Sequence, residues 1–304
     1  MSHNKESAFF GHLMALITAC IWGCTFVSSK VLLRSFTPVV IIVFRFALAY
    51  IALWIISPRL LRVRDFKTEL LFAFAGLCGV SLYFLGENIA LTCTQASNVG
   101  IIISVSPLFT AVLSAVLGYG DRPTGRFYAG FIISLIGISI ITLNGTFVLK
   151  ISPKGDLLTV CAALSWAVYS IVMMRIGKKG YGTLLSTRRV FFYGLVFMVP
   201  ALFVMGFSPD LSLLKAPENI INLLFLGVIA SALCYIMWNR AFKILGAVRT
   251  NVYIYIIPVV TIIASAVILK ERITWISAAG SALTLGGLYL SQSKRKVKTN
   301  ARQK

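Results

Sequence analysis

Apolar residues form about ten long runs along the chain, and short segments rich in polar or basic residues separate them. Each run has roughly 18–25 residues, the length that an α-helix needs to cross the hydrocarbon core of a bilayer. The connections are too short to hold a soluble domain. The pattern therefore predicts an all-α integral membrane protein with ten transmembrane helices, at residues 12–33, 37–57, 68–92, 96–118, 125–145, 156–177, 183–207, 219–241, 247–269 and 273–292.

The composition supports a membrane protein and excludes several kinds of chemistry. Hydrophobic residues make up 58% of the 304 residues and charged residues 12%, whereas a soluble domain has about 25% charged residues. The six cysteines lie within the apolar runs and form no CxxC motif, so neither a disulfide framework nor a zinc site is predicted. The chain has no P-loop motif, and its two histidines, His3 and His12, lie at its start. We therefore expect a protein that is not an enzyme and that uses no ATP, metal or cofactor.

Basic residues are distributed unevenly between the ends of the runs. The formal net charge is +20, and most of the 29 Lys and Arg residues fall on one predicted side of the membrane. Because basic residues favour the cytoplasmic side, both chain ends are predicted to be cytoplasmic. The tail SKRKVKTNARQK, residues 293–304, is interpreted as a basic anchor that contacts anionic lipid rather than nucleic acid. The start, MSHNKESAFFGH, lacks a signal-peptide cleavage pattern, so the first helix is expected to remain as an anchor in the cell (inner or plasma) membrane.

The two halves of the chain match each other. Residues 104–117, SVSPLFTAVLSAVL, resemble residues 255–268, YIIPVVTIIASAVI. Each copy has five helices, and because five is an odd number, the second copy must enter the membrane from the opposite side. The sequence therefore predicts two inverted repeats, at residues 12–145 and 156–292, which is an architecture of secondary transporters. The matched pairs are Trp22–Trp166 and Arg45–Arg189 (144 positions apart), Gly76–Gly227, Asn88–Asn239, Pro107–Pro258 and Thr110–Thr261 (151 apart), and Gly130–Gly280 and Gly137–Gly287 (150 apart).

Four stretches of the chain resemble transporters of the EamA type in the drug/metabolite transporter superfamily: WGCTFVSSK (22–30), FRFALA (44–49), VSPLFTAVLSAVL (105–117) and IPVVTIIASAVILKERIT (257–274). The resemblance implies ten helices, cytoplasmic termini, two repeats and alternating access of a central cavity. It also implies export of amino acids, other metabolites or toxic organic compounds, commonly driven by an ion gradient. The first copy departs from the pattern, because it has GYGDRPT where the second has LKERIT.

Glu87 is the one acidic residue placed well inside a predicted span. Lys30 and Arg45 are predicted at a similar depth in the outer half of the membrane. Because an unpaired charge is costly to bury, we expect these three side chains to pair with one another. They form either a structural ion cluster or the outer part of a cavity. In the second case they bind a substrate carboxylate or amine, or take up a proton during transport.

Further candidates for the cavity are aromatic residues and prolines near the middle of the spans. Pro107 and Pro258 are either simple kinks or bends that offer backbone carbonyls to a substrate. Trp22 and Trp166 are either packed in the core or form walls on which an organic substrate stacks. Tyr169 lies three residues after Trp166, so both face the same side of one helix.

Polar residues complete the predicted cavity. Asn88 and Asn239 could supply neutral hydrogen bonds to a polar substrate, and Tyr255 begins the repeated segment that contains the second proline. In the inner half, Arg189 either faces the cavity or extends to the cytoplasm. The position that matches Glu87 is Trp238, so the two halves differ in charge.

Three functions compete. The leading one is a secondary transporter that exports small polar or amphipathic metabolites, such as amino acids, with possible coupling to a proton or another ion. Efflux of lipophilic cations requires Glu87 to be free of its basic neighbours. A membrane scaffold without transport is disfavoured by the inverted repeat. A small-molecule substrate and the lipid bilayer are the expected partners, and the oligomeric state is left open.

Overall fold

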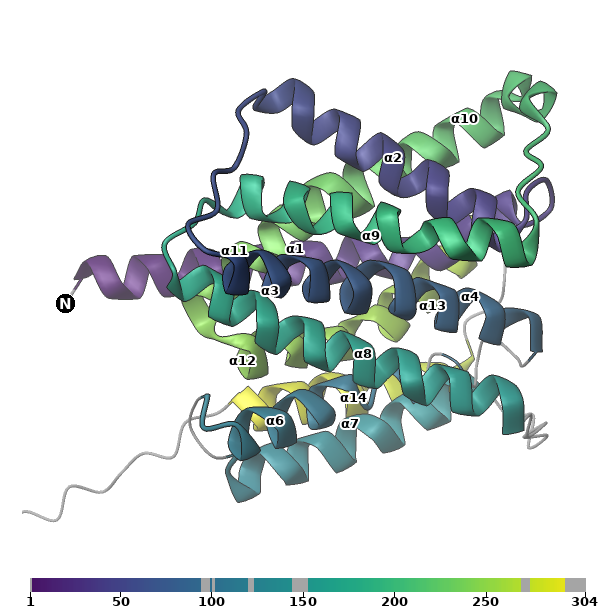
Figure 1. Cartoon of the computed structure of the whole chain (residues 1–304). Helices are drawn as coiled ribbons and strands as arrows, with labels where there is room; N and C mark the ends of the chain where they lie inside the picture. The colour runs from purple at the N-terminus through teal and green to yellow at the C-terminus, as the bar shows by residue number, and fades with distance from the viewer. Residues whose placement is uncertain are drawn as a thin grey trace, which may run out of the picture.

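The computed structural model describes residues 2–93, 99, 102–119, 123–143, 153–268 and 274–292, and every regular element within these ranges is a helix (Figure 1). The basic tail at residues 293–304 and the GYGDRPT segment fall wholly or partly outside these ranges. The elements are α1 (Ser2–Leu32), α2 (Pro38–Ile56), α3 (Phe66–Gly76), η1 (Leu77–Leu82), α4 (Tyr83–Cys93), α6 (Ser106–Val116), α7 (Gly125–Leu143), α8 (Pro153–Lys178), α9 (Thr183–Met205), η2 (Leu211–Lys215), α10 (Pro217–Leu224), η3 (Phe225–Leu233), α11 (Cys234–Leu245), α12 (Ala247–Asn251), η4 (Val252–Tyr255), α13 (Ile256–Ile268) and α14 (Trp275–Gln292).

These elements join into ten helical runs within the described ranges, which agrees with the predicted number of helices. Three runs are composite, namely α3–η1–α4, α10–η3–α11 and α12–η4–α13. Six helices in the described residues are long and apolar enough to cross a membrane, and α6, the first part of α7 and the α12–α13 region are shorter apolar helices. The protein is therefore an all-helical membrane protein with several spans.

Residues at the helix ends explain where several elements begin and end. The Asp65 side chain caps α3 by accepting hydrogen bonds from the backbone N–H of Thr68 at 2.7 Å and from its hydroxyl at 2.8 Å. Proline occupies the first turn of α2 and of α10, where its missing N–H costs nothing. Helix α11 ends at Gly246, whose φ of 84° lies in the left-handed region that favours glycine.

Each proline of the repeated segment lies in the first turn of a new α-helix rather than within a continuous one. Pro107 is the second residue of α6, after a turn, and Pro258 is the third residue of α13, after the 3-10 segment η4. Pro107 cannot donate to the carbonyl of Ile103, and the Ser106 hydroxyl donates to that oxygen at 2.6 Å instead. The predicted kink is thus a break, and the carbonyl that Pro107 frees is bound by the protein and not offered to a substrate.

Helices α7 and α14 lie side by side (Figure 1), with their backbones in direct contact. A Cβ atom at Gly130 would lie 2.5 Å from the carbonyl oxygen of Gly287, and one at Gly137 would lie 2.6 Å from that of Gly280. Between these contacts, the hydroxyl of Ser134 donates to the carbonyl of Thr284 at 3.1 Å. Only glycine permits this close approach, which is a common way to pack helices in a membrane.

The third and eighth helical runs each contain a π-helical segment, η1 and η3. Both runs pack tightly at a glycine just before or within that segment. Gly76 faces the backbone of α9, and Gly227 faces the carbonyl of Arg45 on α2. π-Helical turns are rare in proteins overall, but those that occur are often at functional sites. The two runs that contain them are therefore candidates for the functional site.

Candidate functional site

Five aromatic side chains from α1, α8 and α11 form a central aromatic cluster, which we define as Trp22, Trp166, Tyr169, Tyr235 and Trp238. The Trp22 ring lies 5.4 Å from that of Trp166, 5.8 Å from that of Tyr235 and 4.8 Å from that of Trp238, measured between centroids. All five side chains are buried. The structure therefore brings together the predicted residues Trp22, Trp166 and Tyr169 and adds two aromatic residues to them.

The π-helical segments supply backbone carbonyls to this cluster. The indole N–H of Trp22 donates to the carbonyl of Ala230 in η3 at 2.9 Å, and the hydroxyl of Tyr235 donates to that of Gly79 in η1 at 3.0 Å. A π-turn changes the backbone hydrogen-bond register and can leave a carbonyl for a side chain. Each aromatic donor thus joins its own helix to a π-helical segment of another run.

Two buried asparagines connect the cluster to other helices. The Asn251 oxygen accepts the indole N–H of Trp166 at 3.1 Å, and its amide nitrogen donates to Thr110 at 2.8 Å and to Ser170 at 2.9 Å. This network joins the helical runs that contain α6, α8 and α12.

The other buried amide is Asn239, one of the predicted residues. Its oxygen accepts the hydroxyl of Tyr169 at 2.8 Å, and its nitrogen donates to Thr187 at 3.0 Å. Both asparagine side chains are thus fully engaged with protein partners.

Arg45 is buried, with 7% of its surface exposed, and its closest polar partner is neutral. Its Nε donates to the Ser231 hydroxyl at 2.6 Å, and its guanidinium lies 4.6 Å from the centroid of the Phe84 ring. Glu87, on the same helix as Phe84, lies close enough to Arg45 and Tyr83 to interact electrostatically with both. Arg45 and Glu87 nevertheless form no direct ion pair, since among the described side chains the one ion pair is Arg189–Glu69.

Of the predicted mutual pairing, Arg45 and Glu87 show an electrostatic interaction but no direct ion pair, because the Arg45 Nε donates to Ser231 in η3 and its guanidinium lies over Phe84. The side chain of Lys30 lies outside the described residues. The site therefore contains a buried cation that is bonded to a neutral hydroxyl, and a carboxylate that interacts with this cation electrostatically beside the aromatic cluster.

Other predicted residues lie apart from the cluster or face their own helix. The Asn88 amide donates to the carbonyl of Phe84 one turn earlier, at 2.9 Å. Tyr255 packs in a second core with Phe131 and Val252. Pro107 and Pro258 begin helices, as described above.

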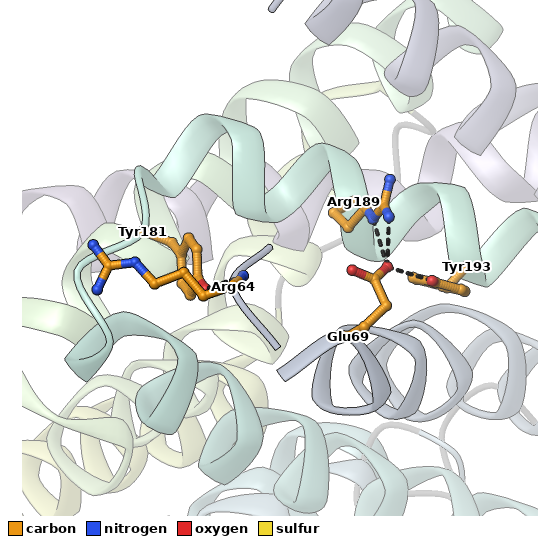
Figure 2. Close-up of polar contacts among 5 residues, drawn as sticks. All are labelled: Arg64, Glu69, Tyr181, Arg189 and Tyr193. Atoms are coloured by element: carbon orange, nitrogen blue, oxygen red, sulfur yellow. Dashed lines mark hydrogen bonds and ion pairs between the residues drawn. The ribbon is translucent and has the colours of Figure 1, made fainter. Parts of the chain in front are cut away.

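Near the start of α3, the side chain of Glu69 binds two side chains of α9 (Figure 2). Its carboxylate lies 2.6 Å from the Arg189 Nη2, accepts the Arg189 Nε–H at 2.7 Å, and accepts the Tyr193 hydroxyl. Arg189, for which the sequence left open whether it faces the cavity or extends to the cytoplasm, forms an ion pair and is 32% exposed. In the same region, the backbone N–H of Arg64 donates to the hydroxyl of Tyr181 at 3.2 Å (Figure 2).

Several residues of the site were not anticipated from the sequence, namely Tyr83, Phe84, Ser231, Tyr235 and Asn251. A helical-face argument could have found some of them. Tyr83 and Glu87 are four residues apart on one helix, and Ser231, Tyr235 and Trp238 follow at spacings of four and three. Asn251 had no such signal, because its partners are on other helices.

Buried charges beside a central aromatic cluster, in a bundle of apolar helices, are typical of substrate or ion pathways in multi-pass membrane proteins. The family model of the EamA-like transporter family matches residues 9–143 and again residues 153–292. The chain belongs to this family.

Relatives that are named as transporters or efflux pumps match nearly the whole chain. A protein of Archaeoglobus fulgidus, named only as a transporter, is 28% identical over 93% of this chain and 98% of its own length. An Escherichia coli protein named "probable amino-acid metabolite efflux pump" is 26% identical over 92% of this chain and 93% of its own length. A crystal structure matches with a TM-score of 0.76 over 93% of this chain and 96% of its own chain, at 17% identity, which supports the fold alone.

Proposed function

We propose that the protein is a secondary active transporter that exports small polar or amphipathic metabolites, such as amino acids, by alternating access. The observation that carries this proposal is the environment of Arg45, a buried cation without a direct acidic partner. Charges inside a span are costly, and in membrane proteins they commonly mark substrate or ion pathways. With Glu87 nearby and aromatic rings beside both, the site offers a partner for each part of a zwitterion. The name of the Escherichia coli relative agrees with this substrate class.

We also propose that residues 12–145 and 156–292 are inverted repeats related by a two-fold axis in the membrane plane. The contacts of α7 and α14 support this symmetry. Gly130 and Gly280 are paired in the sequence, as are Gly137 and Gly287, but the contacts in space join Gly130 to Gly287 and Gly137 to Gly280. This exchange of partners is the pattern of an isologous contact.

Two further observations support the repeat. The family model matches the chain twice. The π-helical segment η1 (Leu77–Leu82) corresponds, at the offset of 151, to the last six residues of η3 (Phe225–Leu233). An inverted repeat with cytoplasmic termini in the cell membrane suits alternating access around a central site.

In the proposed mechanism, the substrate carboxylate binds the Arg45 guanidinium and replaces the Ser231 hydroxyl as its acceptor. The substrate amine binds the Glu87 carboxylate. A proton and the amine compete for that carboxylate, so protonation of Glu87 from the outside favours release of the substrate there. This competition couples export to a proton gradient.

Efflux of lipophilic cations is a second candidate, and one observation favours it: Glu87 forms no direct ion pair with Arg45. The two candidates differ in the part that Arg45 plays, because a cation is repelled by its guanidinium and a carboxylate is attracted.

Counterflow in proteoliposomes distinguishes the candidates. The purified protein is assayed with a panel of labelled amino acids and with tetraphenylphosphonium, in the presence and absence of a pH gradient. We expect counterflow of at least one amino acid and stimulation by the gradient. Counterflow of tetraphenylphosphonium without counterflow of any amino acid overturns the proposal in favour of cation efflux.

A further inference from the structure

The three indoles of the central aromatic cluster differ in how their N–H groups are satisfied. The N–H of Trp22 donates to Ala230 and that of Trp166 to Asn251. Among the described residues, the N–H of Trp238 has no hydrogen-bond partner, and the side chain is 0% exposed. A buried donor without a partner loses its hydrogen bonds to water, so such a group in a native structure calls for an explanation.

Neighbouring polar side chains do not offer Trp238 a partner. Both ends of the Asn239 amide are engaged, with Tyr169 and Thr187, and the Tyr235 hydroxyl donates to Gly79. Of the aromatic rings in contact with the Trp238 ring, that of Trp22 lies nearest, at 4.8 Å between centroids. A ring face accepts an N–H only weakly.

The position of Trp238 relates it to the proposed carboxylate site. Ser231, which binds Arg45, lies seven residues before Trp238 in one continuous helical run, with Tyr235 between them on the same face. Seven residues span about 10 Å along a helix. Along this face lie a cation at one end, aromatic rings in the middle and an unpartnered donor at the other end.

We propose that the Trp238 N–H is a substrate-binding donor that binds an uncharged oxygen at the far end of a substrate whose carboxylate lies on Arg45. This inference rests on the proposed function and deepens it. The ligand class is an amphipathic amino acid with an apolar aromatic body and an ether, hydroxyl or carbonyl oxygen at the end of the body away from its carboxylate. The rings of Trp22 and Tyr235 contact the apolar body, and the donor selects for the oxygen.

A pair of matched ligands tests the proposed donor. O-Methyl-L-tyrosine and 4-ethyl-L-phenylalanine have the same length and differ by one ether oxygen in place of a methylene group. Binding of both is measured to the wild type and to Trp238→Phe, in lipid nanodiscs. We expect the wild type to prefer the ether by about threefold to tenfold, and Trp238→Phe to lose this preference because its affinity for the ether falls.

The matched control is Trp166→Phe, which removes an indole N–H that the protein already binds, and this variant is expected to keep the preference for the ether. An equal affinity of the wild type for both ligands overturns the inference, as does an unchanged preference in Trp238→Phe. If amino-acid counterflow persists in either case, the proposed function stands and only the inference fails. If the wild type binds neither ligand and counterflows no amino acid, both fail.

Thermal stability provides an independent readout. Both variants replace a buried indole by a smaller ring and lower the melting temperature, but Trp238→Phe removes no hydrogen bond to the protein, so we expect its melting temperature to fall less than that of Trp166→Phe. Trp166→Phe leaves the Asn251 oxygen without its donor, so its melting temperature is expected to fall. A fall in Trp238→Phe as large as that in Trp166→Phe means that the protein itself holds the Trp238 N–H, and overturns the inference.

Discussion

Arg45 and Arg189 match each other in the two halves of the chain, yet their surroundings differ in every respect that matters for function. Arg189 is 32% exposed at the end of α9 and is paired with the carboxylate of Glu69, which also accepts the Tyr193 hydroxyl. Arg45 is 7% exposed, and its bonded partner is the hydroxyl of Ser231. The charge of Arg189 is compensated within the protein, and that of Arg45 is not compensated by direct contact.

The difference indicates that the two matched arginines have different roles. A partly exposed ion pair contributes little free energy, but it fixes the geometry between two helices, here α3 and α9. A buried cation without a direct counter-ion is costly and is retained where a ligand supplies the counter-ion. We therefore assign a structural role to Arg189 and a substrate-binding role to Arg45, within the proposed function.

Of the variants that test this comparison, replacement of Arg45 is expected to have the largest effect. Arg45→Gln removes the charge that binds the substrate carboxylate, so amino-acid counterflow is expected to fall by about 100-fold or more. Since the variant also removes a buried charge, its melting temperature should be unchanged or higher. Counterflow and thermal unfolding are measured on the same preparation.

Arg189→Gln is the matched control. It is expected to lower the melting temperature, because Glu69 loses its partner, and to keep counterflow within a few fold of the wild type. If Arg189→Gln abolishes counterflow while Arg45→Gln retains it, the roles assigned to the two arginines are contradicted.

Replacing Glu87 separates substrate binding from ion coupling. In Glu87→Gln the side chain cannot exchange a proton, so stimulation of counterflow by a pH gradient should disappear. The affinity for amine-bearing substrates is expected to fall by about tenfold, because the amine loses a charged acceptor. Counterflow as a function of pH, with and without a gradient, measures both effects. Normal affinity and normal pH dependence in this variant contradict the role of Glu87.

A double-mutant cycle tests the ion pair between Glu69 and Arg189. Glu69→Gln and Arg189→Gln are each expected to destabilise the protein, and the double variant to lose less than the sum. The interaction free energy should be about 0.5–1 kcal/mol, the range of partly exposed pairs. It is obtained from unfolding of the four proteins in the same detergent. An interaction energy of zero means that the charge of Arg189 contributes nothing to the contact of α3 with α9.

The fold could be predicted from the sequence to a large extent, because the hydrophobic runs specify helices directly. All ten runs contain helices, and the glycines that lie between α7 and α14 were matched in the repeat, but the sequence did not indicate that these two helices touch. The sequence alone could not reveal that Ser106 binds the carbonyl freed by Pro107, since both interpretations of a proline agree with the same pattern.

The site was predicted less completely, because its contacts join residues far apart in the chain. Sequence reasoning found Arg45, Glu87 and the two paired tryptophans, which stand out by residue type and depth. Ser231 lies 186 positions from Arg45, and Glu69 lies 120 positions from Arg189. Depth in the membrane can be estimated from one helix, but which helix faces which cannot, so the partners of both arginines came from the structure.

The smallest expected effect concerns Asp65, which caps the same end of α3 that holds Arg189. Hydrogen bonds from the hydroxyl and the backbone of Thr68 lower the pKa of Asp65 below its usual value. A carboxylate with a lowered pKa stabilises the folded state above its unfolded pKa of about 4, and this contribution is lost as the pH falls through the folded pKa. Asp65→Asn keeps a capping oxygen but no longer titrates. Its melting temperature should therefore fall less between about pH 6 and pH 3 than that of the wild type. An identical fall of the melting temperature in both proteins means that the charge of Asp65 does not stabilise this end of α3. The contact of Glu69 with Arg189 is then independent of that charge.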